Sequence, residues 1–362
     1  MGIKRRGRVL GFLSIKTQFD NLGDALINRE LCRLVADRVK SYVDFSRAPV
    51  EFQNSMKVSG HRNLIVLREG GFPKLIWKMI AARFCGDECY FFLNPGGLGG
   101  RKKPLKSLIS AFIYNFLLTL LYVLGVKICH VGISYDAMAG IERYIALWRR
   151  RVLYSFVVRD NLSYKYLDDI GMKADGIVPD LSFNLYNGAS ISSSSRNKVA
   201  FSFRFDGKAG AKLIEKLVLR VIEEYGPAFE YIFVVQVARD REGTEALLEI
   251  CRKKEGKCSL LLCHEDIEAL STFYSQCDAI YSNRLHALLL AAHSGASPYA
   301  AISMGKQPKI EGMFNDLGIS DRLLFIDSVG INITSSTPIA QDKFRAEGEF
   351  LGSYFNNLLR KG

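Results

Sequence analysis

Short apolar runs alternate along this chain with longer stretches in which apolar residues recur at the spacing of an amphipathic helix. In the second half, the runs that predict strands are 198–204, 231–238, 259–263, 279–283 and 298–303. The stretches that predict helices lie between them, at 208–225, 244–254, 267–276 and 285–294. Continuous apolar runs are typical of parallel strands buried on both faces, and a helix connects each pair of such strands. The pattern predicts a doubly wound α/β domain.

The first half repeats this alternation less regularly. Its predicted strands are 8–14, 63–68, 90–93, 126–134 and 156–158, and a long helix is predicted at 22–40. A serine-rich stretch at 188–197 (GASISSSSRN) has no apolar periodicity, as is typical of a linker. We therefore expect two domains, 1–187 and 198–335, and a C-terminal helix within 340–362 that packs back across the domain boundary. The predicted fold is two Rossmann-like doubly wound α/β domains that face a cleft.

The segment 107–126 differs from the rest because its 20 residues carry no charge. That length is sufficient to span a bilayer. However, Asn115 lies within the segment, and Gly125 is typical of a helix end that leads directly into the strand 126–134. A buried or interfacial helix within a βαβ unit therefore fits better than a membrane span, which stays open as an alternative.

Composition and charge narrow the class of protein. Of the 362 residues, 48% are hydrophobic and 24% are charged, which excludes a mainly disordered chain. The net charge of +12 arises entirely in residues 1–187, which hold 28 Lys and Arg against 16 Asp and Glu. This excess favours nucleic acid, anionic lipid or a phosphorylated substrate as partner, although solubility alone would also explain it. Since the Phe and Tyr residues fall in apolar periodic runs, we expect them in the core, and we expect no nucleic-acid partner.

The cysteines and the start of the chain bear on metals and location. The eight cysteines are scattered and form no CxxC pair, so the sequence indicates neither a zinc site nor a redox pair. The basic start is followed by an apolar run that is short for a signal peptide. We therefore expect a cytoplasmic protein with no metal site.

Two loops of the first half follow predicted strands and carry candidate binding residues. The first contains Asn21, Gly23 and Asp24 at the start of the helix 22–40, where helix N–H groups favour an anion. Capping by Asn21 or Asp24 would explain these residues equally well. The second loop, NPGGLGG, contains Asn94 and two glycines, Gly96 and Gly97, that let a ligand approach the backbone closely. A single glycine-rich loop is weak evidence.

Three arginines, Arg159, Arg204 and Arg284, stand at the ends of predicted strands. For Arg159 a surface ion pair is a strong alternative, and Asp160 can cap the helix that follows it. Arg284 belongs to the sequence SNRLHA, in which His286 occupies the first turn of a helix. A histidine at this edge faces the cleft and suits general acid–base catalysis, although a lone histidine is more often structural. Ligands of open α/β sheets bind at the carboxyl ends of strands, so these residues are candidates for one site.

With these motifs the chain resembles the polysaccharide pyruvyl transferase family. The resemblance is carried, in family order, by DNLGDALINREL (20–31), NPGGLGG (94–100), VRDNLSYKYLDDIG (158–171), PDLSF (179–183) and SNRLHALLLAAHSGASPYA (282–300). Lys306 and Lys309 follow, where the family tends to place a lysine. The chain departs from the family pattern at Val157, where a serine often precedes the Arg–Asp pair, and at Pro95, which interrupts the glycine loop.

The resemblance implies a glycosyltransferase-B-like fold and transfer of a pyruvyl group from phosphoenolpyruvate to two hydroxyls of a sugar. The product is a cyclic ketal, phosphate is released, and no cofactor is implied beyond the donor substrate. The implied acceptor is a cell-surface glycan, of the capsule or exopolysaccharide type, or its lipid-linked precursor. An anionic membrane surface at the inner face of the membrane is a further expected partner.

The resemblance and the residue chemistry together assign roles to the candidate residues. Phosphoenolpyruvate carries a carboxylate and a phosphate, which bidentate cations hold well. We expect it to contact Arg159, Arg204, Arg284, Leu285 and Lys306. His286 is the candidate that gives a proton to the methylene carbon, and Asp24 is the candidate that accepts the hydroxyl proton or orients the sugar. The acceptor is expected to contact Asn21, Gly23, Asn94, Gly96 and Gly97.

Two alternatives remain open. A nucleotide-sugar-dependent glycosyltransferase of the same fold would need an acidic residue late in the second half to hold a ribose, and Glu311 is the candidate. A non-catalytic membrane-surface protein would use the basic first half and the segment 107–126. Such a protein would not need His286 beside Arg284.

Overall fold

The computed structural model describes residues 7–58, 60–98, 105–138, 140–186, 196–205, 207–253, 257–263, 266–328 and 341–360. The first sheet consists of β1 (Val9–Ser14), β2 (Lys40–Asp44), β3 (Leu64–Leu67), β4 (Glu88–Phe92), β5 (Gly96–Leu98), β6 (Lys127–Tyr135), β7 (Leu153–Val158) and β8 (Gly176–Ile177). Its helices are α1 (Leu22–Ala36), α2 (Val50–Met56), α3 (Gly71–Phe84), α4 (Leu105–Val123), α5 (Ile141–Arg151) and α6 (Asn161–Asp169). The strand order is β3-β2-β1-β4-β6-β7-β8, with β5 paired to β6.

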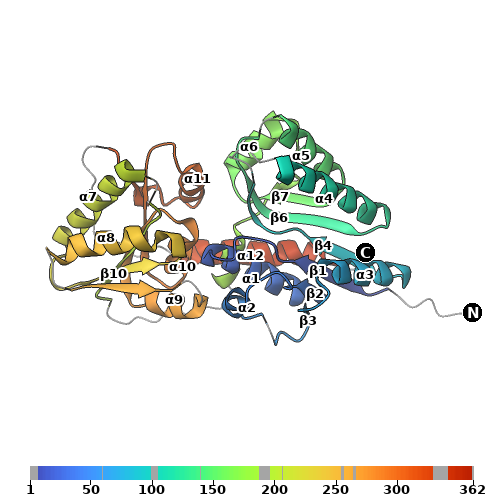
Figure 1. Cartoon of the computed structure of the whole chain (residues 1–362), viewed down its shortest axis with the longest axis horizontal. Helices are drawn as coiled ribbons and strands as arrows, with labels where there is room; N and C mark the ends of the chain where they lie inside the picture. The colour runs from blue at the N-terminus through green and yellow to red at the C-terminus, as the bar shows by residue number, and fades with distance from the viewer. Residues whose placement is uncertain are drawn as a thin grey trace, which may run out of the picture.

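The 3-10 helix η1 (Leu181–Tyr186) ends this half, and the second sheet follows (Figure 1). Its strands are β9 (Lys198–Ser202), β10 (Glu230–Val235), β11 (Cys258–Leu262), β12 (Cys277–Ser282), β13 (Ser297–Ile302) and β14 (Leu323–Phe325), in the order β11-β10-β9-β12-β13-β14. Its helices are α7 (Gly207–Tyr225), η2 (Ala238–Asp240), α8 (Arg241–Arg252), α9 (Ile267–Tyr274), α10 (Leu285–His293), α11 (Pro308–Asp316) and η3 (Ser320–Arg322). The strand pairs of both sheets are parallel, so the predicted doubly wound α/β class is confirmed. Most of the expected linker, 188–195, lies outside the described residues.

The helix predicted at 22–40 is wrong at its end. α1 stops at Ala36, and Lys40 begins β2, which pairs with β1. The reason is that Val35, Val39 and Val43 are all buried and keep a spacing of four residues across the break. A helical periodicity therefore continues in the sequence after the helix has ended.

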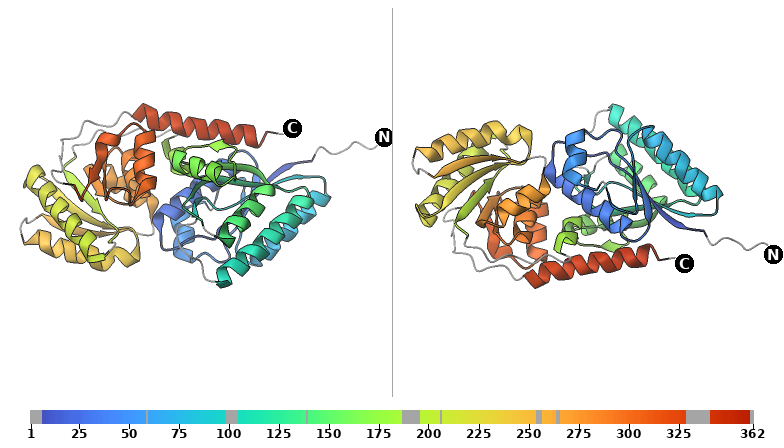
Figure 2. Two further views of the ribbon diagram at one scale, coloured as in Figure 1. Left: turned by 90° about the horizontal axis from the view of Figure 1, so that it is seen from above. Right: turned by 90° about the horizontal axis from the view of Figure 1, so that it is seen from below.

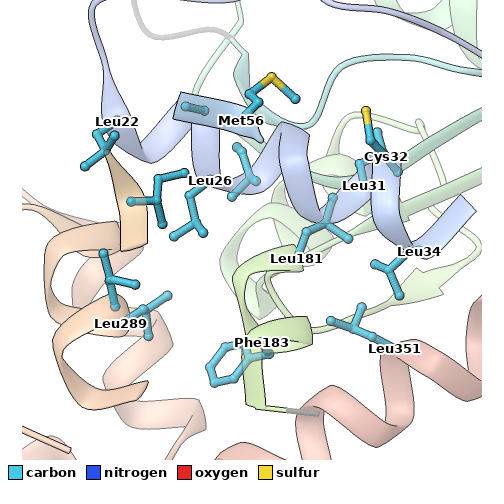
Figure 3. Packing of buried hydrophobic residues seen from close by; sticks show 14 of the residues in the cluster. Leu22, Leu26, Leu31, Cys32, Leu34, Met56, Leu181, Phe183, Leu289 and Leu351 are labelled. Atoms are coloured by element: carbon cyan, nitrogen blue, oxygen red, sulfur yellow. The ribbon is translucent and has the colours of Figure 1, made fainter. Parts of the chain in front are cut away.

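Three clusters of buried apolar side chains hold the layers together. One lies under α3, α4 and α5 on one face of the first sheet, and another lies under α7 and α8 on one face of the second. The third, which we call the central cluster, joins the two halves of the molecule (Figure 3). In it, Leu26 of α1 and Leu289 of α10 share a contiguous core with Phe183 of η1. The two sheets are therefore parts of one packed body.

The C-terminal helix α12 (Gln341–Leu358) follows the second sheet in the chain but packs against the first (Figure 2). The Phe355 ring stacks on Phe92 of β4 with centroids 6.0 Å apart. The Tyr354 hydroxyl lies 2.6 Å from the Ser155 hydroxyl of β7, and Arg38 donates to the carbonyl of Gly352. Residues 329–340, which lead to this helix, lie outside the described part of the chain.

The apolar segment 107–126 forms α4, and the glycine Gly125 that follows it has a positive φ of 79°. Of the two forms expected, a buried or an interfacial helix, the buried one is wrong, because only 17% of Lys106–Val123 is buried. Within the described residues this is the one helix long and apolar enough to cross a membrane. The expectation that the aromatic residues are core residues is wrong here too, since Phe112 and Phe116 are exposed.

Candidate active site

Each sheet has one switch point, where the chain connections from two neighbouring parallel strands lead to opposite sides of the sheet. Ligands of such sheets bind outside the carboxyl ends of the strands at this point. In the first sheet this point lies between β1 and β4, and in the second it lies between β9 and β12. The Asn94 side chain marks the first point, because it donates to the Ser14 carbonyl and accepts from the Lys16 N–H. The Asn283 side chain marks the second, because it exchanges hydrogen bonds of 2.7 and 2.8 Å with the backbone of Arg204.

His286 lies where the two halves meet. Its Nε2 is 3.6 Å from Oδ2 of Asp180 and 3.5 Å from Nη1 of Arg159. Both partners come from the first half, whereas His286 stands in the first turn of α10, directly after β12. The strand ends of both sheets therefore contribute to one polar cluster.

Arg159 is the centre of the network on the first-half side. Its Nη1 donates to Oδ2 of Asp180 at 2.6 Å, and its Nε donates to Ser134 Oγ at 2.6 Å. Ser134 in turn donates to Asp160, whose other oxygen accepts from the Ser163 N–H and caps α6, as expected. The alternative of a surface ion pair is wrong, because Arg159 is only 7% exposed.

The carboxyl group of Asp180 is fully buried and remains ionised. Burial alone would raise its pKa, but the charges of Arg159 and His286 hold that pKa below its usual range. The Ser182 N–H also donates to Asp180 at 3.0 Å. A buried carboxylate fixed in this way can orient the His286 ring.

The first turn of α1 lies directly against His286. A Cβ atom at Gly23 would be 2.4 Å from His286 Nδ1, so this contact requires glycine. Asn21 is the N-cap of α1 and accepts from the Gly23 N–H, and Asp24 accepts from the Thr17 hydroxyl at 2.6 Å. The structure therefore brings Asn21, Gly23 and Asp24 together with His286.

The glycine loop lies next to the second half as well. A Cβ atom at Gly97 would be 2.7 Å from Lys309 Nζ, and that ammonium group is 2.9 Å from Oδ2 of Asp136, just after β6. Gly96 has a φ of 120°, which favours glycine. Lys306 is exposed in the turn before α11. It is thus Lys309, to which we gave no role, that reaches the first half.

Arginines gather around one carboxylate at the switch point of the second sheet. Arg284 forms an ion pair with Asp240, which ends the turn after β10. Burial lowers the pKa of Arg284 while Asp240 opposes that shift, and the nearby charges of Arg239 and Arg204 lower the pKa further. Among the described residues, three guanidinium groups thus lie near this carboxylate, and guanidinium groups are well suited to bind an anion. Leu285 begins α10 beside this cluster and is half-buried.

The sequence pattern does not single out several residues of this polar cluster. Asp180 follows the two-residue strand β8, which is too short to be recognised from its pattern, although PDLSF itself was noticed. Ser134 and Asp136 end β6, and the rule that places sites at strand ends could have found them. Asp240 was hidden because charged residues surround it in the sequence VARDREG.

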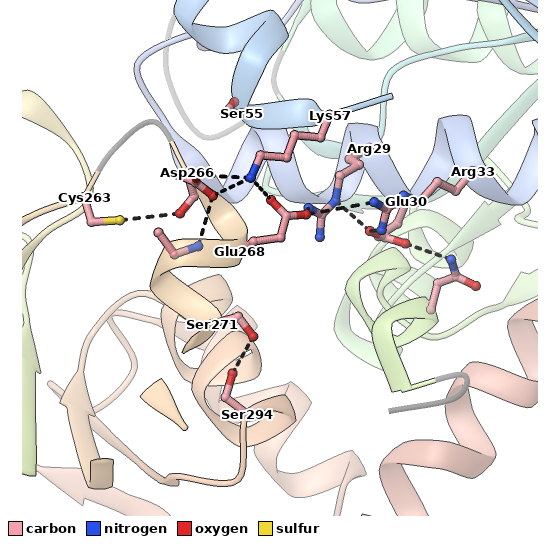
Figure 4. Close-up of polar contacts among 12 residues, drawn as sticks. Arg29, Glu30, Arg33, Ser55, Lys57, Cys263, Asp266, Glu268, Ser271 and Ser294 are labelled. Atoms are coloured by element: carbon pink, nitrogen blue, oxygen red, sulfur yellow. Dashed lines mark hydrogen bonds and ion pairs between the residues drawn. The ribbon is translucent and has the colours of Figure 1, made fainter. Parts of the chain in front are cut away.

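Ion pairs join the two halves beside this site (Figure 4). Arg29 of α1 pairs with Glu30 and, at 2.5 Å, with Glu268 of α9. Lys57 pairs with Glu268 at 3.0 Å and with Asp266 at 3.1 Å. On α6, Asn161 donates to Asp316 of α11 at 2.9 Å. These contacts fix the position of α10 relative to the strand ends of the first sheet.

A surface depression of about 530 Å³ lies elsewhere, between α1, η1 and α12, and contains none of the candidate residues; its lining includes Arg33, Asp37, His61 and Asn184. Among the residues that the structure describes, no three His, Cys, Asp or Glu side chains are placed to hold a metal ion. The polar cluster around His286 is therefore the candidate active site, and acid–base chemistry on an anionic substrate is what its groups can perform.

Several solved structures share the fold of this chain. The structure of Anabaena Alr3699/HepE in complex with UDP and glucose matches with a TM-score of 0.52 and 14% identity, covering 97% of this chain and 95% of that one. The S. aureus MnaA–UDP structure matches with a TM-score of 0.51 and 9% identity, covering 95% of this chain and 87% of that one. At these identities the likeness shows the fold alone, which is glycosyltransferase-B-like.

No curated protein sequence matches the chain. The family model for polysaccharide pyruvyl transferase matches residues 21–300. That range begins at the cap of α1 and extends through the glycine loop, Arg159, Asp180 and His286 to β13. The chain belongs to the polysaccharide pyruvyl transferase family.

Proposed function

We propose that this protein transfers a pyruvyl group from phosphoenolpyruvate to two hydroxyls of a sugar, forming a cyclic ketal and releasing phosphate. The observation that carries the proposal is the placement of His286 between buried Asp180 and the first turn of α1. A transferase of this kind needs a proton donor for the methylene carbon and a cationic site for the donor's charges. Family membership supports a transferase of polysaccharide biosynthesis.

The donor site that fits best is the arginine cluster of the second sheet. Arg204 and Arg284 flank its switch point, and Arg239 adds a third positive charge. Their planar guanidinium groups match a carboxylate and a phosphate. Lys306 extends this positive surface from the exposed turn before α11. Arg159 uses two of its nitrogens inside the protein, so we assign it to holding Asp180 and His286 as well as to attracting the donor.

The proton is delivered from the imidazole of His286. Its Nε2 faces Asp180 and Arg159, while its Nδ1 packs against Gly23, where the absence of a side chain leaves room for the ring. The proton goes to the methylene carbon of phosphoenolpyruvate, and the first sugar oxygen bonds to the adjacent carbon. The bond from that carbon to the phosphate oxygen then breaks, and the second sugar oxygen takes its place. One hydroxyl proton returns to His286, and the other leaves with phosphate.

The acceptor sugar fits against the first half, on the loops at its switch point. Asn21, Gly23, Asn94, Gly96 and Gly97 line these loops. Because Asp24 already accepts hydrogen bonds from Thr17 and the Gln18 N–H, we assign it to orienting the sugar and the loop rather than to removing a proton. The acceptor is a cell-surface glycan, as in capsule or exopolysaccharide, or its lipid-linked precursor, and the reaction takes place in the cytoplasm at the inner face of the membrane.

Incubation of the purified protein with phosphoenolpyruvate and a panel of free and lipid-linked glycans tests this proposal. We expect phosphate release together with a mass gain of one pyruvyl ketal on the acceptor. His286→Gln should lower turnover roughly 10²- to 10⁴-fold with an unchanged circular dichroism spectrum. Turnover of UDP- or GDP-sugars with phosphoenolpyruvate ignored would favour the glycosyltransferase alternative, in which Glu311 on α11 would hold the ribose.

A further inference from the structure

The outward face of α4 is apolar along its whole length. Its exposed large side chains recur at spacings of three and four residues, which places them on one stripe of the helix: Ile109, Phe112, Ile113, Phe116, Leu120 and Val123. The opposite stripe packs on the first sheet through Leu118 and Leu121. A helix on the surface of a soluble domain normally presents polar residues to water. Here both stripes are apolar, and only the inner one is covered by the described residues.

Hydrogen bonds to α5 keep α4 on the sheet. The buried Asn115 donates to the Ile145 carbonyl of α5 and accepts from Arg149 Nε, and the Trp148 indole donates to Thr119. A bilayer-spanning orientation would break these bonds in an environment without replacements. The face that α4 offers to a membrane is therefore its side.

The neighbouring helices extend the apolar surface and surround it with positive charge. Trp77 and Phe84 of α3 and Tyr144 of α5 are each more than two-thirds exposed. α3 carries three basic residues and no acidic one, α4 adds Lys106, and α5 carries four arginines against one glutamate. These helices lie on the outer side of the first domain, away from the second (Figures 1 and 2). An apolar strip with a basic surround is complementary to a bilayer that contains anionic headgroups.

We propose that α4, flanked by α3 and α5, is a monotopic docking surface that lies flat on an anionic lipid bilayer, with the apolar stripe at the level of the acyl chains. Binding requires both contributions, because neither shallow apolar insertion nor charge alone anchors a protein firmly. The docking surface exists whether or not the protein transfers pyruvyl groups.

The consequence for catalysis rests on the proposed function. α4 runs from the carboxyl edge of the first sheet, where β5 ends at Leu98, towards the amino edge at Lys127. With α4 flat on the bilayer, the strands of this sheet run along the membrane plane, and the switch-point loops open beside the lipid surface. The sugar of a lipid-linked acceptor would reach Asn94 and Gly97 while its lipid carrier stays in the membrane.

Co-sedimentation with vesicles tests the docking surface directly. One set contains equal parts of phosphatidylglycerol and phosphatidylcholine, and the other contains phosphatidylcholine alone. We expect binding to the anionic set at low salt and release as salt rises. The double variant Ile113→Ser/Phe116→Ser should weaken this binding by about tenfold or more, since it removes two inserted side chains. Phe350→Ser on α12 is the matched control, because Phe350 is 52% exposed and Phe116 is 55% exposed.

The insertion depth of the docking surface and the contribution of its basic residues to binding are measured in separate experiments. In a Trp148→Phe background, Trp77 is the remaining tryptophan and should be quenched by brominated phosphatidylcholine included in the anionic vesicles. Lys74→Gln/Lys106→Gln should weaken binding to anionic vesicles and leave activity on a short soluble acceptor unchanged.

Three results would overturn the proposal: no vesicle binding, equal binding to both vesicle sets, or an equal loss with Phe350→Ser. A stable dimer in sedimentation velocity that Ile113→Ser/Phe116→Ser converts to monomer would identify the face as a contact between copies of this chain, and would overturn it too. Failure of the pyruvyl transfer assay with intact vesicle binding would contradict only the proposed function.

Discussion

Asp180 contacts charged or polar side chains from both halves of the molecule. It holds a negative charge inside the protein, and that charge is compensated by Arg159 from the same half and by His286 from the other. A buried charge left without its partner costs about 3–5 kcal/mol, so each member of this trio fixes the other two. The position of His286, the proton donor that we propose, is therefore set before any substrate binds.

Arg284→Lys is the residue-scale change that separates donor binding from acceptor binding. Lysine keeps the charge beside Asp240 but loses the planar fork that grips a carboxylate or phosphate. We expect the KM for phosphoenolpyruvate to rise about tenfold or more, and the KM for the sugar to change little. Steady-state kinetics with each substrate varied in turn measures both. An equal rise in both constants would remove Arg284 from the donor site.

Two histidines, the buried His130 and the partly buried His293, make stability depend on pH. Burial lowers the pKa of His293 to about 4 and that of His130 to about 3, below the unfolded value of about 6.5. Below pH 6.5 the unfolded chain therefore binds protons that the folded chain does not, and the free energy of unfolding falls as pH decreases. Each group contributes up to about 1.4 kcal/mol per pH unit between the unfolded value of about 6.5 and its own folded pKa, and nothing further below that.

His293→Leu should reduce this pH dependence, because one of the two titrating groups is removed. The substitution suits the site, where His293 packs edge-on against Tyr186 and its Nδ1 has no hydrogen-bond partner among the described residues. Urea unfolding at pH 7, 6 and 5 measures the effect as a shallower slope, by about 1 kcal/mol per pH unit at the acidic end. Parallel curves for the two proteins would contradict the assignment.

At the scale of elements, the sequence predicts strands and helices that are long enough to show a hydrophobic period, and it misses strands of two or three residues. Continuous apolar strands such as β10 and β12, and amphipathic helices such as α8, are visible because their period is sustained. β8 has two residues and β5 has three, so neither shows a period, and both lie beside the site. The candidate site was predictable where a loop follows a long strand, as at His286. It was not predictable at Asp180, because only the tertiary fold places that residue beside α10.

Gly23→Ala shows how the start of α1 serves the site. Alanine favours a helix over glycine by about 1 kcal/mol, but here its Cβ would lie 2.4 Å from His286 Nδ1. We expect this clash to displace His286 and lower kcat at least about tenfold, since small misplacements of a catalytic group are costly. Gly210→Ala on α7 is the matched control. A Cβ there meets nothing within 4 Å, so it should stabilise the protein by about 0.5–1 kcal/mol and leave kcat unchanged. Wild-type kcat in Gly23→Ala would mean that turnover does not depend on the position of His286 against α1.

For the whole molecule, the order of the chain and the order of packing differ. The first sheet is complete as a set of strands by residue 177, yet α12 covers part of its apolar face with residues that come after the second sheet. Phe355, Leu351 and Phe344 belong to the central cluster. The stability of the first domain therefore depends on the end of the described chain.

Phe355→Ala tests this dependence. The Phe355 ring is fully buried against Phe92, and a large-to-small change at such a site costs about 3–5 kcal/mol. We expect that loss in urea unfolding, with exchange of the amide hydrogens of β4 and α1 accelerated. Phe350→Ala, on the exposed side of the same helix, should change the free energy of unfolding by no more than about 0.5 kcal/mol. If the two variants lose equal stability, α12 does not complete the core of the first domain.

The position of α12 at the end of the described chain also determines when the first domain can complete its core during translation. Domains generally fold in turn as the ribosome releases them, at about 5–20 residues per second. Roughly 150 residues separate η1 from α12, so about 8 to 30 s pass in which Phe92 and Phe183 have been translated but their cover has not. Until α12 has been translated, the nascent first domain exposes the apolar surface that this helix covers in the folded protein. During that interval a chaperone that binds exposed apolar surface would bind the nascent chain there.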